Sequence, residues 1–267
     1  MDIPRSAFAS ALFDLRGSTA VITGGSRGLG RVIADTLASA GAEVVIVSRK
    51  LDACQRAADE IAAATGRRTH AIACHVGRWN ELDHLVDKVN STVGRAVDIL
   101  VNNAGMSPPY NKLSDITEAL YDKVMDVNLK GPFRLSALFG EQMVATGGGV
   151  IVNISSVAAE QPRPNAAIYA MAKAGLNALT TALAYGFGPT VRVNGVVCGP
   201  FLTDISSSWD IEASKEAYHR TMALQRAADP SEIAGALLYL ASRASSFTTG
   251  TVLRVDGGYT PPSRETG

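Results

Sequence analysis

Tyr169 and Lys173 are the two residues whose types and spacing most directly suggest chemistry. They stand four positions apart, so a helix would place the phenol and the ammonium on one face, with Cβ atoms roughly 5–6 Å apart. A positive charge beside a phenol favours the phenolate and lowers the phenol pKa from its usual value of about 10. We therefore predict that Tyr169 gives and takes a proton near neutral pH. The alternative is an aromatic packing residue beside a solvated lysine.

The residues before this predicted helix place two serines at the end of a strand. The apolar run at 150–154 is typical of a buried strand, and Ser155 and Ser156 end it before a loop that contains proline. Successive side chains of a strand point to opposite faces, so the two hydroxyl groups are expected to diverge. A serine pair at this place is also a common turn or helix-cap signal.

A glycine-rich turn follows the first predicted strand, which spans 19–23. The turn, GGSRGLG at 24–30, opens a helix that Gly41 ends. At such a helix start, backbone N–H groups and the positive end of the helix dipole face an anion, and glycines allow the anion to approach closely. This order of strand, turn and helix predicts a phosphate-binding loop.

The second predicted strand, 43–47, ends in the sequence Ser48-Arg49-Lys50. An NAD site typically has a carboxylate about 20 residues after the glycines, which holds the ribose 2′-hydroxyl. Here that place is basic. With Arg27 of the glycine turn, these cations can bind a ribose 2′-phosphate, to which arginine offers bidentate contacts. We therefore expect NADP rather than NAD, the alternative being solvated charges at a strand end.

Polar residues also stand after the later strands and inside one long helix. His75 follows the strand predicted at 69–74 and is expected near an adenine, while the Asn-Asn-Ala-Gly turn at 102–105 is expected near a ribose. Asn128 stands just before a Gly-Pro pair in the helical region predicted at 117–143. Proline is expected to kink that helix and to free backbone groups for water.

Composition excludes several classes of function. The 267 residues include 25 basic and 25 acidic side chains, so no global field recruits nucleic acid or an anionic membrane. No apolar run approaches the ~20 residues of a membrane span, and the N-terminus lacks the apolar core of a secretory signal. The four histidines are scattered and predict no metal site. The odd number of cysteines predicts buried free thiols and a cytoplasmic protein: Cys54, Cys74 and Cys198.

Apolar strands and helices alternate along the whole chain. This order predicts an α/β fold of the Rossmann type, a doubly wound parallel sheet of about seven strands with helices on both faces. We expect a single domain over 17–260, with an N-terminal tail at 1–16 and a C-terminal tail at 261–267. The more polar segment around 201–228 is predicted to act as a substrate loop or lid.

Taken together, the motifs resemble the short-chain dehydrogenase/reductase family. The resemblance covers nearly all of 15–259, with the motifs in the family's order and spacing, and each is modest alone but specific in combination. The matching residues are Thr-Gly-x-x-x-Gly-x-Gly at 23–30, Asn-Asn-Ala-Gly at 102–105, Asn128, Ser156, Tyr-x-x-x-Lys at 169–173 and Asp-Gly-Gly at 256–258.

The resemblance implies an NADP(H)-dependent alcohol–carbonyl oxidoreductase with a catalytic tetrad. Tyr169 would be the acid/base at the substrate oxygen, and Lys173 would lower its pKa and hold the nicotinamide ribose. Ser156 would donate a hydrogen bond to the substrate oxygen as charge develops; it lies thirteen positions before Tyr169, the family's common spacing, so Ser155 would support the loop. Asn128 would anchor a water that links Lys173 to solvent.

The predicted cofactor site combines the family pattern with the local motifs. It comprises Gly24, Ser26, Arg27, Gly28, Leu29, Gly30, Ser48, Arg49, Lys50, His75, Val76, Asn103, Ala104, Gly105, Tyr169, Lys173 and Thr203. The chain departs from the family in three places. His75 replaces the usual Asp or Asn at the adenine, Cys198-Gly199-Pro200 replaces Pro-Gly after strand six, and 184–189 lacks the usual Glu.

Several functions remain open at this point. Within the enzyme class, the resemblance is to 3-oxoacyl-[acyl-carrier-protein] reductases, with gluconate-type sugar-acid and steroid or other secondary-alcohol dehydrogenases as alternatives. The predicted substrate loops are mostly apolar or neutral, with Arg163 as an exception, which disfavours a highly charged substrate. From other classes, a catalytically silent dinucleotide-binding sensor or scaffold and a nucleotide-using methyltransferase share the glycine turn. Because members of the family commonly assemble into dimers or tetramers, the resemblance implies a homotetramer or homodimer.

Overall fold

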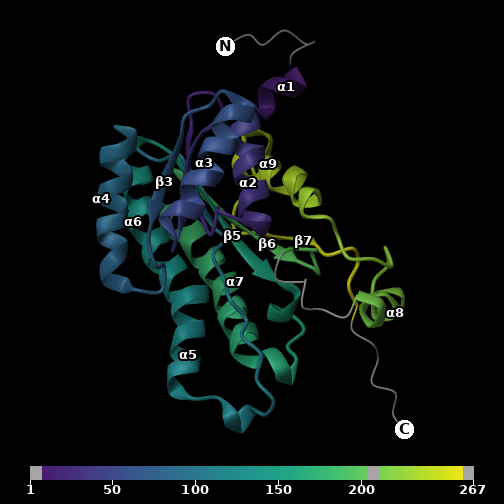
Figure 1. Ribbon diagram of the computed structural model, residues 1–267. Coiled ribbons are helices and arrows are strands. Elements are labelled where there is room, and N and C mark those ends of the chain that lie inside the picture. The colour runs from purple at the N-terminus through teal and green to yellow at the C-terminus, as the bar shows by residue number, and fades with distance from the viewer. Residues whose placement is uncertain (1–7, 204–210, 261–267) are drawn as a thin grey trace.

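One seven-stranded sheet forms the centre of the protein, in a computed structural model that describes residues 8–203 and 211–260 (Figure 1). Every paired strand is parallel, and the strand order is β3-β2-β1-β4-β5-β6-β7. The fold prediction is confirmed. The strands are β1 (Thr19–Thr23), β2 (Glu43–Ser48), β3 (Thr69–Ala73), β4 (Ile99–Asn102), β5 (Gly149–Ser156), β6 (Val191–Cys198) and β7 (Val252–Val255).

Helices cover both faces of this sheet. Against one face, α2, α3 and α9 bury a core that includes Ile33, Ile61 and Leu237; against the other, α4, α6 and α7 bury Leu85 and Phe139 (Figure 1). Such double coverage explains why the strands read as continuous apolar runs. The helices are α1 (Phe8–Leu12), α2 (Gly28–Ser39), α3 (Leu51–Thr65), α4 (Trp79–Val93), α5 (Glu118–Met125), α6 (Gly131–Thr146), α7 (Ala167–Phe187), α8 (Ile211–Thr221) and α9 (Ala234–Ala241).

A buried chain of polar side chains links the central strands. Asn102 of β4 pairs in register with Asn153 of β5. Asn102 Nδ2 donates to Asn153 Oδ1 and to Ser136 Oγ, each at 2.9 Å. Asn153 Nδ2 in turn donates to Thr180 Oγ1 at 2.9 Å, and all four side chains are fully buried. Hydrogen bonding of this kind allows polar groups inside an otherwise apolar core.

The long helical region takes a different form from the predicted kink. A π-helical turn (Asp126–Lys130) joins α5 to α6, and the N–H of Gly131 bonds to the carbonyl of Asp126, five residues back. A Cβ on Gly131 would lie 2.2 Å from the carbonyl oxygen of Val76. The glycine therefore lets this turn approach the loop after β3, and the chain widens here instead of breaking.

The domain boundaries at residues 17 and 260 remain predictions, and the structure describes contacts close to the first of them. Within the predicted tail at 1–16, Leu15 is buried and its N–H bonds to the carbonyl of Ala40. In the predicted lid at 201–228, residues 204–210 lie outside the described residues, as does the tail at 261–267. Across residues 8–203 and 211–260, no helix is both long and apolar enough to span a membrane. The three cysteines are free and buried, as predicted.

Candidate active site

The predicted chemical groups meet at the carboxyl ends of the strands. Ser156 is the last residue of β5, and α7, which carries Tyr169 and Lys173, packs against β5 and β6. The glycine turn follows β1 at the same edge, because the strands are parallel. Ligands of open parallel sheets bind at this edge. The geometry therefore brings the predicted catalytic side chains next to the predicted phosphate loop.

The two serines diverge, as strand alternation predicts. Ser155 Oγ donates to the backbone carbonyl of Lys173 at 3.4 Å and is buried against α7. Ser156 Oγ accepts from the N–H of Ala158 at 3.2 Å, and it also hydrogen-bonds Tyr169, which favours the phenolate and opposes the rise in the phenol pKa. Ser156 is thus the serine that shares a space with the tyrosine hydroxyl.

The Tyr169 phenol is harder to ionise than the sequence predicts. Burial raises the pKa of Tyr169 to about 12, and the hydrogen bond from Ser156 only partly offsets that rise. Lys173 Nζ lies 5.7 Å from the phenol ring centroid and donates to the carbonyl of Ile154 at 2.7 Å. Burial also lowers the pKa of Lys173 to about 8. The phenol pKa therefore lies above its usual value and not below it as predicted, because desolvation outweighs the hydrogen bond from Ser156; Lys173 is not among the groups that shift this pKa.

Cys198 stands beside these groups at the end of β6. It pairs in register with Ser156 and is buried. Burial raises the pKa of its thiol to about 12, and the charge of Lys173 partly opposes that rise. The next residue, Gly199, continues the pairing by donating to the carbonyl of Val255, so the departure from the family pattern leaves the β6–β7 alignment intact.

Asn128 is fully buried in the π-helical turn and ties that turn to the loop after β4. Its Nδ2 donates to the carbonyls of Met106 (2.9 Å) and Val124 (2.8 Å), and its Oδ1 accepts from the N–H of Met106 at 3.2 Å. Gly105 lies between this amide and the lysine, since a Cβ there would be 3.0 Å from Asn128 Oδ1 and 3.6 Å from Lys173 Nζ. The predicted water relay stays a prediction; the observed contacts hold the loop.

The glycine turn and the asparagine turn interlock. Gly24 and Gly28 have positive φ values of 68° and 55°. A Cβ on Gly30 would lie 2.2 Å from the carbonyl oxygen of Gly24. Asn103 Nδ2 donates to the carbonyls of Thr23 (2.9 Å) and Gly24 (3.4 Å), so this amide shapes the loop from the side. The close backbone packing leaves the cradle that a diphosphate group requires at a helix start.

Basic side chains surround the outer end of this cradle. Arg27, Arg49 and Lys50 are exposed, and none forms an ion pair within residues 8–203 and 211–260. In contrast, Arg31 on α2 is neutralised by Asp35 and Glu60. A hydrogen bond of 3.0 Å between Ser26 Oγ and Ser48 Oγ joins the glycine turn to the end of β2, where these cations stand.

The other predicted cofactor residues line the same edge. His75 Nδ1 accepts from the N–H of Gly77 at 3.2 Å, which fixes the imidazole over its own turn. Val76 is buried, and Leu29 is partly buried against the core on the α2 side of the sheet. Thr203 stands opposite the glycine turn, since a Cβ on Gly28 would lie 3.6 Å from Thr203 Cβ.

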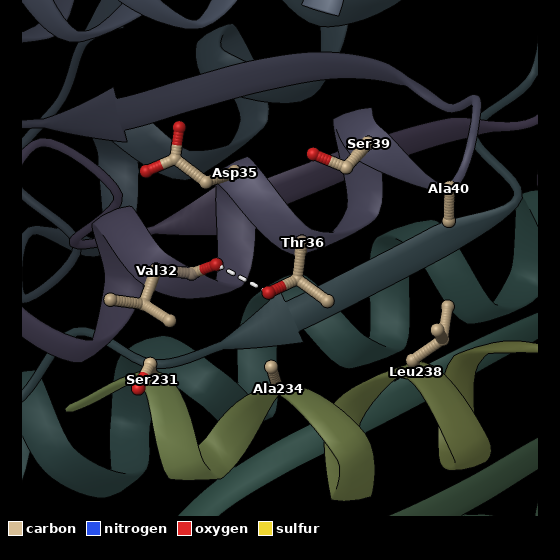
Figure 2. Close-up of a pocket in the computed structure, with 8 residues that line it drawn as sticks. All are labelled: Val32, Asp35, Thr36, Ser39, Ala40, Ser231, Ala234 and Leu238. Carbon is tan, nitrogen blue, oxygen red and sulfur yellow. Dashed lines mark hydrogen bonds between the residues drawn. The ribbon is translucent and has the colours of Figure 1, made fainter. Parts of the chain in front are cut away.

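Two hollows differ in their relation to this site. A small cavity of about 10 Å³ lies against Tyr169, between Val124, Ile168 and residues 107–110. A larger, open hollow of about 590 Å³ lies between α2 and α9, and its lining contains none of the predicted catalytic or cofactor residues (Figure 2). Two features near Tyr169 were not predicted: Tyr110, which lines the small cavity, and Cys198 as a neighbour of Lys173.

Known proteins match the chain over nearly its whole length. Residues 24–260 match the family model described as enoyl-(acyl carrier protein) reductase. The 7α-hydroxysteroid dehydrogenase of Escherichia coli (strain K12) is 37% identical over 252 residues, which cover 94% of this chain and 97% of that protein.

Two solved structures have the same architecture. A 7α-hydroxysteroid dehydrogenase complexed with NADH and 7-oxo glycochenodeoxycholic acid superposes with a TM-score of 0.88 at 37% identity, covering 94% of this chain and 97% of that one. The L-sorbose reductase of Gluconobacter frateurii, complexed with NADPH and L-sorbose, has a TM-score of 0.86 at 29% identity, with coverages of 93% and 98%.

Proposed function

Because the chain belongs to the short-chain dehydrogenase/reductase family, we propose that it interconverts a carbonyl and a secondary alcohol with a nicotinamide dinucleotide and with Tyr169 as acid/base. The observation that carries this proposal is the meeting of Ser156, Tyr169 and Lys173 beside the glycine cradle. Ser156 and Tyr169 hydrogen-bond each other and are partly buried, and Lys173 is buried and held by the carbonyl of Ile154 in β5.

Each residue of the proposed tetrad has a separate task. The bound dinucleotide would supply or accept the hydride. In the direction of reduction, Tyr169 donates its phenolic proton to the substrate oxygen, and Ser156 donates a hydrogen bond to the same oxygen as negative charge develops there. Lys173 holds a positive charge near the phenolate that results. Asn128 holds the loop at 103–106 against the π-helical turn, so that Gly105 of this loop lies next to Lys173.

We propose NADP(H) as the preferred cofactor. The similar proteins do not decide this, since the hydroxysteroid dehydrogenase structure contains NADH and the sorbose reductase structure contains NADPH. The support comes from this chain's own charges, because Arg27, Arg49 and Lys50 stand exposed and without a carboxylate partner in the part of the chain described. A ribose 2′-phosphate would neutralise this cluster through charge-assisted hydrogen bonds.

For the substrate we propose a small molecule with a neutral, largely apolar environment around the reacting carbonyl. Arg163 is the notable charge in the loop before α7, and it is already engaged by the hydroxyl and the ring of Tyr259. Steroid-like and other apolar ketones, 3-oxoacyl thioesters, and sugars or sugar acids are the classes to compare. We further propose a cytoplasmic homotetramer or homodimer, with residues around 201–228 acting as a lid; the three buried free thiols fit a reducing compartment.

The test is a panel of those substrates, assayed with NADPH and NADH in parallel. Tyr169→Phe should lower kcat at least about 100-fold and leave the NADPH dissociation constant nearly unchanged, because only the transferable proton is lost. Tyr185→Phe is the matched control, since Tyr185 lies on the same helix with its side chain 86% exposed. Dinucleotide binding without turnover across the panel would instead favour the sensor or scaffold hypothesis.

A further inference from the structure

The hydroxyl group of Tyr110 joins the loop after β4 to the residues just before Tyr169. It donates to the carbonyl of Pro164 at 2.6 Å and accepts from the backbone N–H of Ala167 at 2.6 Å. Tyr110 belongs to the loop after β4, more than fifty residues away in the chain. A phenolic hydroxyl has one proton to donate and accepts through its lone pairs, so a single oxygen atom makes both bonds.

The hydrogen bond from Ala167 to Tyr110 lies at the N-terminus of α7, where the helix has no side-chain cap of its own. Ala167 is the first residue of α7, and its N-cap residue, Ala166, has no side-chain oxygen to accept a hydrogen bond. The first N–H groups of a helix have no partner inside the helix and are usually capped by Ser, Thr, Asp or Asn. Tyr110 takes over this task for Ala167. Tyr169 follows two residues later, in the same first turn.

The segment before α7 is anchored at its other end by different contacts. Arg254 of β7 pairs with Glu160 at 2.6 Å, and Arg163 hydrogen-bonds the hydroxyl of Tyr259. Those anchors hold the segment to β7 and leave the helix start to Tyr110. The cavity that Tyr110 and Tyr169 both line measures about 10 Å³. It has room for about one water molecule, so the two tyrosines are separated by very little empty space.

We propose that Tyr110 is a positioning residue for the reaction. Its hydroxyl fixes the first turn of α7, and this holds the Tyr169 hydroxyl where the substrate oxygen must meet it. Loss of the tie moves the acid without removing any group that touches the reacting atoms, and misplacement of about 1 Å can lower a rate by up to about 100-fold. The catalytic part of this inference rests on the proposed function, whereas the structural part does not.

The structural part is tested by hydrogen–deuterium exchange in Tyr110→Phe, which keeps the ring and removes both hydrogen bonds. Amides at the start of α7 should exchange about fivefold faster than in the parent protein, the effect of losing one ordinary hydrogen bond. Tyr185→Phe, the same substitution on the exposed side of α7, should leave that exchange unchanged. Equal exchange in Tyr110→Phe and the parent overturns the inference whether or not the chain is an enzyme.

The catalytic part is tested by kinetics on a ketone that the parent enzyme reduces. Tyr110→Phe should lower kcat about 10-fold and keep the NADPH dissociation constant within about twofold. Adding Ala166→Ser offers a side-chain oxygen to the N–H groups of the second or third residue of α7, which fixes the same first turn by a different contact and should restore part of the lost kcat. An unchanged kcat in Tyr110→Phe, or no recovery in the double variant, contradicts the inference. A parent protein that reduces no carbonyl refutes the proposed function, and the exchange measurement still decides whether Tyr110 fixes the helix.

Discussion

At the scale of single residues, three titratable side chains meet at the ends of β5 and β6. Burial raises the pKa of Tyr169 to about 12 and that of Cys198 to about 12, and it lowers the pKa of Lys173 to about 8. All three shifts favour the uncharged form, as expected for groups removed from water. The phenol is therefore protonated at neutral pH, which is the form that carbonyl reduction consumes.

The low pKa of Lys173 predicts a pH dependence of stability. The lysine of the unfolded chain keeps its proton up to about pH 10.4. Between pH 8 and 10.4 the unfolded chain therefore binds one proton that the folded protein has lost, and the free energy of unfolding rises with pH. From pH 7 to 9 the rise should be about 1 kcal/mol. Denaturant titrations at pH 7 and pH 9 should therefore give a change in the free energy of unfolding that is about 1 kcal/mol more positive in the parent than in Lys173→Met; equal changes in the two proteins would contradict the assignment.

Above pH 9 the sign reverses. The thiols of Cys74 and Cys198 and the phenol of Tyr169 keep their protons in the folded protein longer than in the unfolded chain, because their pKa values are raised to about 11, 12 and 12. Stability is then lost as pH increases through this range. Because unfolded thiols begin to lose their protons near pH 8.5, the cysteines oppose the lysine already below pH 9, so the difference between the parent and Lys173→Met is what isolates the lysine.

Cofactor preference is a second prediction at residue scale. Arg49→Asp places a carboxylate where we propose a 2′-phosphate, so the NADPH dissociation constant should rise about 10- to 100-fold. NADH, which lacks that phosphate, should bind with no loss beyond about threefold. Fluorescence titration of both cofactors measures the difference. Arg243→Asp, the same charge change at an exposed residue far from the site, is the control. An equal effect on both cofactors would refute the 2′-phosphate contact.

At the scale of elements, two helical glycines have opposite surroundings. A Cβ on Gly131 would lie 2.2 Å from the carbonyl of Val76, whereas a Cβ on Gly186 near the end of α7 meets no atom within 4 Å. Gly131→Ala should therefore destabilise the protein by about 2 kcal/mol or more, since the π-helical turn must move away from the loop after β3. Gly186→Ala should stabilise it by up to about 1 kcal/mol, because alanine favours the helix.

Chemical denaturation of both glycine variants, side by side with the parent, measures these changes in the free energy of unfolding. A loss of stability in Gly186→Ala, or none in Gly131→Ala, would contradict the packing described here. Comparing the two variants separates the helix preference of alanine, measured by Gly186→Ala, from the contact of the π-helical turn with the loop after β3, measured by Gly131→Ala.

Several elements were predictable from the sequence because local pattern determines them. The run at 19–23 shows no polar alternation since both faces of β1 are buried, and the glycine turn after it forms as expected. The π-helical turn at 126–130 was not predictable in form, because it depends on the contact between Gly131 and the distant Val76. The sequence pattern of a segment indicates which local structure that segment prefers. Contacts between distant segments, such as that of Gly131 with Val76, depend on the whole fold.

The same limit applies to the candidate site. Spacing together with the family resemblance singled out Tyr169, Lys173 and Ser156, which the fold does bring together. It could not predict the sign of the pKa shift of Tyr169, because burial comes from the whole fold. It also missed Tyr110, whose hydroxyl meets α7 only after the loops close.

At the scale of the whole molecule, exposed apolar side chains gather on three neighbouring helices. Tyr121 of α5, Phe133 and Val144 of α6, and Met171 of α7 are each between 39% and 49% exposed. Helix α7 packs against both α5 and α6 (Figure 1). Apolar surface of this kind marks places where proteins associate, and it supports the proposed homotetramer or homodimer.

Light scattering of the parent protein should therefore give a mass of two or four chains. Met171→Lys puts a charge into the apolar area and should lower that mass, whereas Leu51→Lys on α3, a comparably exposed leucine, should not. A parent protein that stays a monomer at micromolar concentration would refute the proposed assembly.

The polar chain from Asn102 through Asn153 to Thr180 has a consequence for how the sheet assembles. If β4 slid past β5 by one position, the Asn102 amide would face Val152 or Ile154, and its hydrogen-bonding groups would be stranded in hydrocarbon. Apolar strands alone would tolerate such a slip, because one valine replaces another with little penalty. The embedded amides therefore favour the observed alignment of β4 with β5 over a slipped one, and so they help to set the edge at which the catalytic side chains meet.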